Sequence, residues 1–517
     1  MEKIIKTLIL LMICLLFVVC KKDKKPKNET SIKTEMKTVY EQSWESLSKH
    51  NEAPNWFQDA KLGIYFHWGV YSVPAFANEW YPRNMHFKDS DVYKHHKEKY
   101  GDPSEFGYHD FVPMFKAENF DAKEWADLFK KAGARFAGPV AEHHDGFSMW
   151  DSKVTPWNAK NKGPKRDVTG ELQKAITNKG MKFITTFHHS RNLQRYSAKN
   201  DSLNKAKHRF QSSHYPYIAG MPPTDDNSEL ALLYGNIPEE QWNEKIWFGK
   251  LKEVIDQYQP DIIWFDSWLD QIPVAYRQKF AAYYLNQAEK LNKEVVIVRK
   301  QNDLPLDFSV DDLEKSRKNT IEKKSWMTDE TVSTGSWCYT EGLKIKSAKD
   351  VLHVLIDIVS KNGVLLLNIS PKADGTILAD QRTVLLKIGA WLDKYGQAIY
   401  GTRPWYTFGE GPTKEPEGSF KNHKEFLKIK YSAKDIRYTT KGNTIYAIVL
   451  GSLMPGKEVN FTAFTKSVLP DNTTIKNIAI LGIKEKTSWR LTDQGLSTIA
   501  PFKINDTMAT VFKIDLK

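Results

Sequence analysis

From about residue 55 to residue 400, short apolar runs alternate with longer segments in which apolar residues recur every three to four positions. The first pattern is typical of strands buried on both faces, and the second of helices with one buried face. Strand, helix and strand in this order predict parallel βαβ units. The predicted strands cover residues 63–67, 135–142, 182–188, 261–266, 295–299 and 364–369.

About seven such units can be counted, which suits a (β/α)8-like, TIM-type barrel with insertions. We therefore predict an α/β barrel domain over residues 45–400. A doubly wound parallel sheet is the alternative, but the chain has no Gly-x-Gly-x-x-Gly or Gly-x4-Gly-Lys-Ser/Thr motif to mark its phosphate site. The polar segment 193–235 predicts a long loop insertion, of the kind that borders an active-site mouth.

Helical periodicity largely ends after residue 400. β-rich runs at 443–450, 473–481 and 507–514 are separated by Gly, Pro and Asn turns. This texture predicts a C-terminal β-sandwich domain over residues 401–517.

The first forty residues carry the pattern of an export signal. The uncharged apolar run 7–19 fits a signal-peptide core of roughly 7–15 residues and is shorter than the roughly 20 residues of a membrane-spanning helix. Cys20 ends this run. We predict a signal peptide of lipoprotein type over residues 1–20, lipid-anchored at Cys20, and a flexible tether over 21–44. Export with cleavage and no lipid is the alternative. The predicted location is the periplasm, outer membrane or cell surface of a bacterium, with membrane contact only through Cys20.

Charge and cysteine content exclude several classes of protein. The net charge is +12, but residues 1–40 hold nine lysines against four acids, and the rest of the chain mixes both signs. A solvated surface is therefore favoured over a nucleic-acid interface. Only Cys338 lies outside the first twenty residues, so no disulfide framework can form and packing must hold the fold.

Side chains capable of chemistry stand where the predicted strands end. In a parallel barrel, functional groups gather at the carboxyl ends of the strands. Acids, imidazoles and a guanidinium at five successive strand ends therefore predict an active site. These residues are His67, Glu142-His143-His144, His188, Asp266 and Arg299.

Asp266 ends an apolar run of strong β propensity. Trp264 lies two positions earlier and therefore on the same face of the strand as Asp266. An aspartate that caps the next helix or turn is the structural alternative. A carboxylate beside an aromatic ring is typical of sugar sites, where the ring packs on C–H groups and the acid attacks or stabilises the anomeric centre.

The fourteen histidines argue against a metal centre. They form no His-x-His or His-Glu-x-x-His motif, and the side chains of the adjacent pair His143-His144 diverge in a regular strand. We therefore predict no metal and no cofactor. Neutral imidazoles that hydrogen-bond sugar hydroxyl groups are the preferred role, and a histidine satisfied within the core is the alternative for each.

At these residues the chain resembles glycoside hydrolase family 29, the retaining α-L-fucosidases. The matching motifs occur in family order over roughly residues 45–400, and the β-rich tail is similar to the second domain of the family. The resemblance implies a (β/α)8-like barrel followed by a β-sandwich. The motifs are Trp56-Phe57, Lys61–Pro74, Asn78–Tyr81, Glu142–Phe147, Gly163–Asp167, Trp264–Asp266 and Ser336-Trp337.

The resemblance also implies roles for single residues. Asp266 matches the nucleophile. Met327 stands where some members carry a proton-transferring glutamate, so the general acid/base falls to Glu314, with Asp329 and Glu330 as competitors. The residues that match the lining of the sugar pocket are His67, Glu79, Trp80, His143, His144, His188, Trp264 and Arg299.

The implied function is an exo-acting retaining α-L-fucosidase, which releases terminal L-fucose from glycans through a covalent glycosyl-enzyme. The implied partner is a fucosylated glycan. Two alternatives stay open. One is a non-catalytic, cell-surface sugar-binding lipoprotein on a hydrolase barrel, and the other is an exo-glycosidase for a fucose-like sugar such as an α-L-galactoside.

Overall fold

The structure is a computed structural model. It describes residues 39–192, 228–235, 237–267, 269–416, 423–469, 473–485, 487–503 and 507–517. The predicted signal peptide, most of the predicted tether and most of the predicted insertion 193–235 lie outside the described residues. Tyr40–Lys517 forms one compact unit. The boundary between the two domains at residue 400 stays a prediction.

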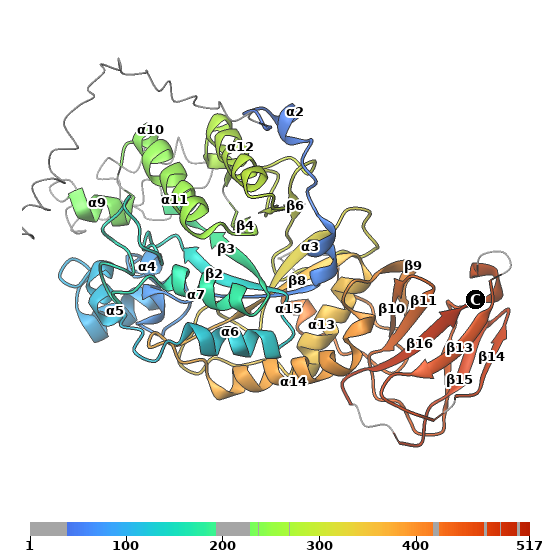
Figure 1. Ribbon diagram of the computed structural model, residues 1–517. Coiled ribbons are helices and arrows are strands. Elements are labelled where there is room, and N and C mark those ends of the chain that lie inside the picture. Colours follow the sequence, from blue (N-terminus) through green and yellow to red (C-terminus); the bar gives the residue numbers. More distant parts are fainter. Residues whose placement is uncertain are drawn as a thin grey trace, which may run out of the picture. The chain divides into compact units, whose positions relative to one another are not determined.

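Eight parallel strands form a nearly closed barrel in the order β6-β5-β4-β3-β2-β1-β8-β7 (Figure 1). The main-chain amides of Leu313 and Lys315 close it between β6 and β7, donating to the carbonyl oxygens of Met327 (3.0 Å) and Asp329 (2.8 Å). The predicted barrel is thus confirmed. Its strands are β1 (Leu62–Phe66), β2 (Phe136–Glu142), β3 (Lys182–Phe187), β4 (Ile262–Phe265), β5 (Val296–Arg299), β6 (Val310–Asp311), β7 (Trp326–Thr331) and β8 (Gly363–Ile369).

Helices surround these strands, with α6, α7 and α11 packed in succession outside the barrel (Figure 1). The described helices of this part are α2 (Trp44–Leu47), α3 (Asn55–Ala60), α4 (Tyr81–Asn84), α5 (Asp91–Tyr100), α6 (Ala122–Lys131), α7 (Val168–Asn178), α9 (Ser228–Tyr234), α10 (Glu239–Gln241), α11 (Gly249–Tyr258), α12 (Val274–Lys290), α13 (Ala348–Ser360) and α14 (Ala379–Tyr395). Shorter helical turns are η1 (Val70–Ser72), η2 (Tyr108–Met114), η3 (His189–Asn192), η5 (Leu269–Gln271) and η6 (Gly396–Ala398). In the part of the chain that the structure describes, no helix is both long and apolar enough to cross a membrane.

Two helical segments differ from the sequence prediction. The end of the predicted loop 193–235 contains α9. The apolar stripe over 241–258 forms a π-helix, η4 (Trp242–Phe248), that continues as α11. Trp242 and Trp247 are five positions apart and both fully buried, which the wider π turn allows because it brings positions i and i+5 to one face.

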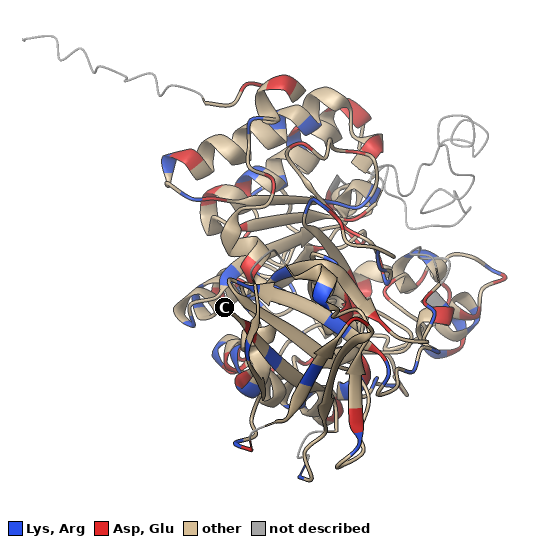
Figure 2. Cartoon of the chain, turned by 90° about the vertical axis from the view of Figure 1, so that its right-hand side faces the viewer, with Lys and Arg blue, Asp and Glu red and all other residues tan. Residues whose placement is uncertain are grey.

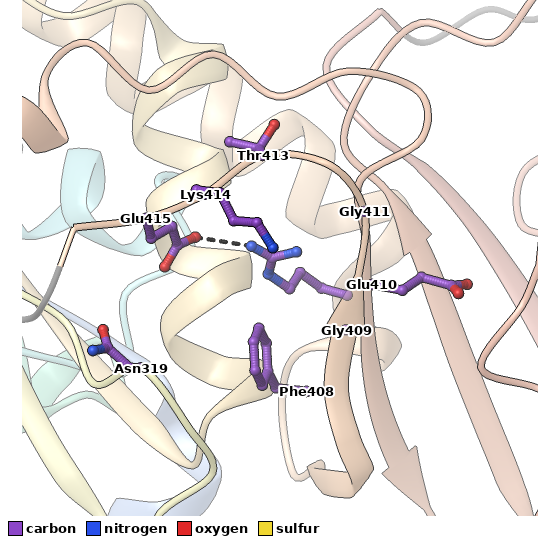
Figure 3. A pocket seen from close by; sticks show the side chains of 9 residues that line it. Asn319, Phe408, Gly409, Glu410, Gly411, Thr413, Lys414 and Glu415 are labelled. Atoms are coloured by element: carbon purple, nitrogen blue, oxygen red, sulfur yellow. Dashed lines mark hydrogen bonds and ion pairs between the residues drawn. The ribbon is translucent and has the colours of Figure 1, made fainter.

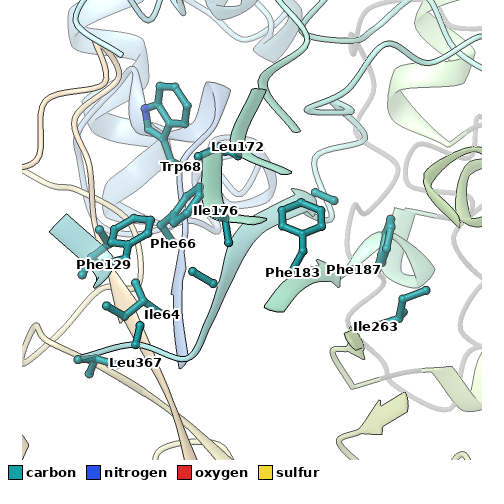
Figure 4. Packing of buried hydrophobic residues seen from close by; sticks show 14 of the residues in the cluster. Ile64, Phe66, Trp68, Phe129, Leu172, Ile176, Phe183, Phe187, Ile263 and Leu367 are labelled. Carbon is teal, nitrogen blue, oxygen red and sulfur yellow. The ribbon is translucent and has the colours of Figure 1, made fainter. Parts of the chain in front are cut away.

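Alternation along each strand builds two apolar layers. Tyr65 of β1 faces the barrel interior, where its ring lies 6.2 Å from that of Trp264. Its neighbours Ile64 and Phe66 face outward, and Phe66 stacks on Phe129 of α6 at 5.9 Å (Figure 4). The side-chain period of two therefore separates the barrel core from the layer under the helices.

The C-terminal strands form two antiparallel sheets, β13-β16-β11-β10-β9 and β12-β15-β14. Their facing sides share one core, in which Phe461 of β12 packs edge-to-face on Phe512 of β16 at 5.1 Å. The predicted β-sandwich is confirmed. Its elements are β9 (Arg403–Glu410), α15 (His423–Phe426), β10 (Ile436–Lys441), β11 (Thr444–Val449), β12 (Glu458–Phe461), η8 (Lys466–Val468), β13 (Ile475–Ile480), β14 (Trp489–Thr492), β15 (Gly495–Ile499) and β16 (Thr510–Leu516).

A buried charge network joins α13 to the sandwich. Asp357, which is fully buried, accepts from Arg437 Nε (2.6 Å) and Lys361 Nζ (2.9 Å). Glu415 also binds Arg437, at 2.8 Å, in the ion pair drawn beside Phe408 in Figure 3. Elsewhere basic and acidic residues are interspersed along the chain (Figure 2), as the mixed composition predicts.

Candidate active site

Three histidines meet at the carboxyl ends of the first three barrel strands. His67 follows β1, His143 follows β2 and His188 follows β3, and all three are buried. The ring centroid of His67 lies 5.4 Å from that of His143 and 5.2 Å from that of His188, and the centroids of His143 and His188 are 4.4 Å apart. Three of the predicted pocket residues thus form one cluster.

Asn368 of β8 fixes the proton on His67. Its amide nitrogen donates to the carbonyl oxygen of Trp337 (2.7 Å) and to Thr331 Oγ1 (3.1 Å). Its Oδ1 must therefore accept, and both the main-chain amide and Nδ1 of His67 lie 2.9 Å from it. Nδ1 of His67 carries the hydrogen, which leaves the lone pair on Nε2.

Burial sets the charge of the cluster. Burial and the other imidazoles lower the pKa of His67 and of His143 well below the usual value. Burial also lowers the pKa of His188, although Asp266 acts in the opposite direction. The three rings are therefore neutral at physiological pH, and each can donate and accept one hydrogen bond.

Trp80, His144 and Glu79 form a second wall. The indole of Trp80 stacks on His144 at 4.1 Å, and the guanidinium of Arg191 lies 5.1 Å from the indole. Glu79 accepts from the main-chain amide of Trp337 at 3.2 Å, and burial raises its pKa. Trp337 in turn stacks on His67 at 5.3 Å, which connects this wall to the histidine cluster.

Asp266 follows β4 and is held by three partners. Its main-chain amide donates to the carbonyl oxygen of Phe187 (3.0 Å), which continues the β3–β4 ladder. Its carboxylate lies 3.1 Å from Arg191 Nε, 3.3 Å from Lys300 Nζ and 3.4 Å from His188 Nδ1. Burial by itself raises the pKa of this carboxyl group, but the two cations and the imidazole hold the pKa well below its usual range.

Glu314 shares Lys300 with Asp266. Lys300 Nζ lies 2.9 Å from Glu314 Oε2, so the two carboxyl groups contact one ammonium. Because both carboxyl groups contact the same nitrogen, the distance between their nearest oxygens cannot exceed the sum of the two Lys300 contacts. This upper limit is compatible with the separation of roughly 5–5.5 Å that is typical of the two carboxyl groups in retaining glycosidases. Burial raises the pKa of Glu314, against the lowering effect of Lys300. The environments therefore shift these two pKa values in opposite directions.

The two competitors for the acid role each bind a partner that Glu314 does not contact. Glu330 binds Lys346 at 2.8 Å and accepts from the main-chain amide of Thr331. Burial acts to raise the pKa of Glu330, but these partners lower the pKa below its usual value, which favours the ionised form. Asp329 accepts from the hydroxyl of Tyr65 at 2.9 Å inside the barrel, and it also lies 3.3 Å from Lys300 Nζ.

Two predicted pocket residues have little access to the mouth. Trp264 is fully buried and lies beneath the cluster, with its ring 5.2 Å from that of His188. Arg299 lies 3.5 Å from Asp311 and donates to the carbonyl oxygen of Leu304, and no contact between Arg299 and Asp266 or Glu314 is found among the described residues.

Lys300 and Arg191 are central to the site and were not predicted. Lys300 is one residue beyond β5, and Arg191 lies in η3, three residues after His188. The sequence analysis considered only the last residues of each strand. Extending the search by three residues into each following loop identifies both cations.

A (β/α)8-like barrel whose mouth holds two carboxyl groups with opposed pKa shifts, beside imidazole and indole rings, defines the class of glycoside hydrolases. Comparison with known families agrees: the family model described as alpha-L-fucosidase matches residues 28–397. The chain belongs to the α-L-fucosidase family, and the predicted fold and enzyme class are confirmed.

Known relatives cover most of the chain. The tissue alpha-L-fucosidase of Rattus norvegicus is 29% identical over 462 residues, 87% of this chain and 86% of the relative. The Homo sapiens tissue enzyme is 28% identical over 475 residues, 89% of this chain and 88% of the relative. The crystal structure of the Thermotoga maritima alpha-fucosidase in complex with fucose is 29% identical with a TM-score of 0.71, and covers 92% of this chain and 100% of that chain.

Proposed function

We propose that the protein is an exo-acting retaining α-L-fucosidase that releases terminal L-fucose from fucosylated glycans. One observation carries the proposal: Asp266 and Glu314 contact the same ammonium group of Lys300, and their pKa values are shifted in opposite directions. A nucleophile must be ionised and a general acid protonated, which is what these shifts favour. Membership of the α-L-fucosidase family supports L-fucose as the sugar.

The proposed reaction has two displacements. In the first, Asp266 attacks the anomeric carbon, the bond from that carbon to the aglycone oxygen breaks, and Glu314 gives its proton to that oxygen. In the second, water attacks the same carbon, Glu314 accepts a proton from the water, and the carboxylate of Asp266 is released. Two inversions restore the original anomeric configuration.

The remaining pocket residues position the sugar. The neutral rings of His67, His143 and His188 offer donors and acceptors for hydroxyl groups, and Trp80 with His144 offers a flat surface for the apolar side of the ring. Glu79 adds a carboxyl group whose pKa is raised by burial. These proposed roles combine the match of each residue to the family motifs with the contacts that the residue makes in the structure.

Trapping the intermediate tests the mechanism. A 2-fluoro-L-fucosyl fluoride slows the second step, and we expect peptide mapping to find the label on Asp266. Asp266→Asn should lose several orders of magnitude in kcat while the circular dichroism spectrum is unchanged. Asp256→Asn, at a half-exposed acid of α11, is the matched control and should keep full activity. A label on another residue, or an active Asp266→Asn, contradicts the proposal.

A panel of aryl glycosides separates the alternatives. An aryl α-L-fucoside has an activated leaving group and needs little help from the acid, so a non-catalytic sugar-binding protein is identified by absence of turnover. An aryl α-L-galactoside differs from the fucoside by one hydroxyl group, carried on the exocyclic C6 where fucose has a methyl group. Preference for the galactoside would redirect the substrate assignment and leave the mechanism intact.

We also propose that the protein is exported and lipid-anchored at Cys20. The support is the apolar run 7–19 directly before that cysteine. Growth with a radiolabelled or alkyne-bearing fatty acid should label the full-length protein, and Cys20→Ala should abolish the label. Equal labelling of the Cys20→Ala variant contradicts the anchor.

A further inference from the structure

The histidine cluster has the properties of a metal site. One ring nitrogen from each of His67, His143 and His188 lies within 4.8 Å of the others. We propose that these three imidazoles bind a divalent ion of the zinc type, Zn²⁺ or Co²⁺, and that the ion excludes the sugar from the pocket. The metal site itself is independent of the proposed fucosidase function, and only its effect on kinetics rests on that function.

Two outer contacts orient the ligands as they do in known metal sites. The acceptor Oδ1 of Asn368 holds the proton on His67 Nδ1, so Nε2 carries the free lone pair. Asp266 lies 3.4 Å from His188 Nδ1, and no partner of His188 Nε2 is found among the described residues. A carbonyl or carboxylate behind a ligating histidine fixes its tautomer and raises its basicity.

The third ligand is equally available. His143 Nδ1 has no hydrogen-bond partner in the described part of the chain. The side chain is buried, with its ring 5.4 Å from that of His67 and 4.4 Å from that of His188. A buried imidazole nitrogen without a partner is available to bind a metal ion.

To bind a metal ion, the three imidazole nitrogens must move slightly closer together. Tetrahedral Zn²⁺ with bonds of about 2.0–2.1 Å to nitrogen places its ligand nitrogens about 3.4 Å apart. The rings must turn inward by roughly an ångström, which leaves the fourth position for water. Lys300 and Arg191, both paired with Asp266, place positive charge nearby and limit the affinity. Imidazole ligands favour Zn²⁺ and Co²⁺ over Mg²⁺ and Ca²⁺, which prefer oxygen.

The sequence argument could not find this site. It searched for two histidines on one strand, whereas the structure brings one histidine from each of three adjacent strands to the same point. The expectation that the protein binds no metal was an inference from single-strand motifs only.

Visible absorption of added Co²⁺ tests the site directly, because tetrahedral Co²⁺ absorbs far more strongly than hydrated Co²⁺. We expect the intact protein to develop these bands, and His67→Gln and His143→Gln, checked for folding by circular dichroism, to lose them. His50→Gln is the matched control, since His50 contacts the carbonyl oxygen of Val295 at the opposite, amino-terminal end of β5. Bands that persist in both pocket variants overturn the proposal.

A second measurement needs no variant. With Zn²⁺, the apparent KM for an aryl α-L-fucoside should rise by the factor 1 + [Zn²⁺]/Kd, about tenfold near ten times Kd, at constant kcat. EDTA should reverse the effect, and equal Mg²⁺ should not reproduce it. A fall in kcat at constant KM overturns the competition. Failure of the fucosidase assay with intact Co²⁺ bands refutes the proposed function and leaves the metal site standing.

Discussion

Lys300→Met is the most direct test of the charge arrangement, because it removes the shared ammonium and keeps the length of the side chain. Lys300 Nζ lies 3.3 Å from Asp266, 2.9 Å from Glu314 and 3.3 Å from Asp329. Burial lowers the pKa of Lys300, but the three acids outweigh it and raise the pKa well above its usual value. Lys300 is therefore charged throughout the working pH range, and its removal deletes a full positive charge.

The size of the effect follows from these contacts. An ion pair at about 4 Å in partly buried surroundings is worth about 4 kcal/mol, and about 1.4 kcal/mol corresponds to one pKa unit. Three acids share this ammonium, and solvent enters when it is removed. We therefore expect the pKa of both Asp266 and Glu314 to rise by about one to two units rather than by the full amount.

The pH dependence of kcat/KM for an aryl α-L-fucoside measures both values in the free enzyme. The proposed mechanism requires ionised Asp266 and protonated Glu314, so the acidic and basic limbs should both move to higher pH in Lys300→Met. Lys300→Arg keeps the charge, and its limbs should stay near those of the unmodified enzyme. A Lys300→Met profile that is lower but not displaced would refute this reasoning.

Two further variants test single interactions. Glu314→Gln should lower kcat/KM about 10²–10⁴-fold for a glycan with a poor leaving group and much less for an activated aryl fucoside. Glu330→Gln, the comparison variant, should show no such dependence on the leaving group. Equal losses for both substrates in Glu314→Gln contradict the acid role. Asp357→Asn should lower the free energy of unfolding by about 1.5–3 kcal/mol, because it removes one of the two carboxylates that bind the buried Arg437, while Glu415 remains. Burial acts to raise the pKa of Asp357, but its cationic partners lower the pKa below its value in the unfolded chain. The difference in free energy of unfolding between the variant and the unmodified protein, measured by urea titration, should therefore be present at neutral pH and shrink as the pH falls below about 4. A difference that is independent of pH contradicts the ion-pair explanation.

The strands that could be predicted are those in which apolar residues dominate. β1 to β5 and β8 are apolar runs because both of their faces are buried. β6 has two residues and leaves no pattern. β7 reads Trp-Met-Thr-Asp-Glu-Thr, and its acids were interpreted as candidate catalytic groups rather than as strand residues. All six are buried, with Asp329 and Glu330 stabilised by specific partners. Local propensity fails here because the strand contributes polar groups to the site.

The sequence could predict those site residues that stand at the end of a strand or match a family motif. Asp266 and Glu314 were both named as candidates, the second from its resemblance to a family pattern, and the structure brings both to Lys300. Their common partner Lys300 was not, because a lysine one residue past a strand has no distinctive sequence signal. Arg299 ends β5 itself, and its pairing with Asp311 depends on the path of the loop that follows.

In the proposed mechanism one acid attacks while another donates a proton, and charge balance at the barrel mouth gives a physical reason for this division. A buried site cannot keep four carboxyl groups ionised beside two cations. Burial raises the pKa of Asp312 and Glu314, whereas Asp266 contacts both cations and stays ionised. Bonding of Asp266 to the sugar, as proposed, would remove the negative charge that helps to raise the pKa of Glu314. The cations would then lower the pKa of Glu314 with less opposition, which would suit it as the base of the proposed second step.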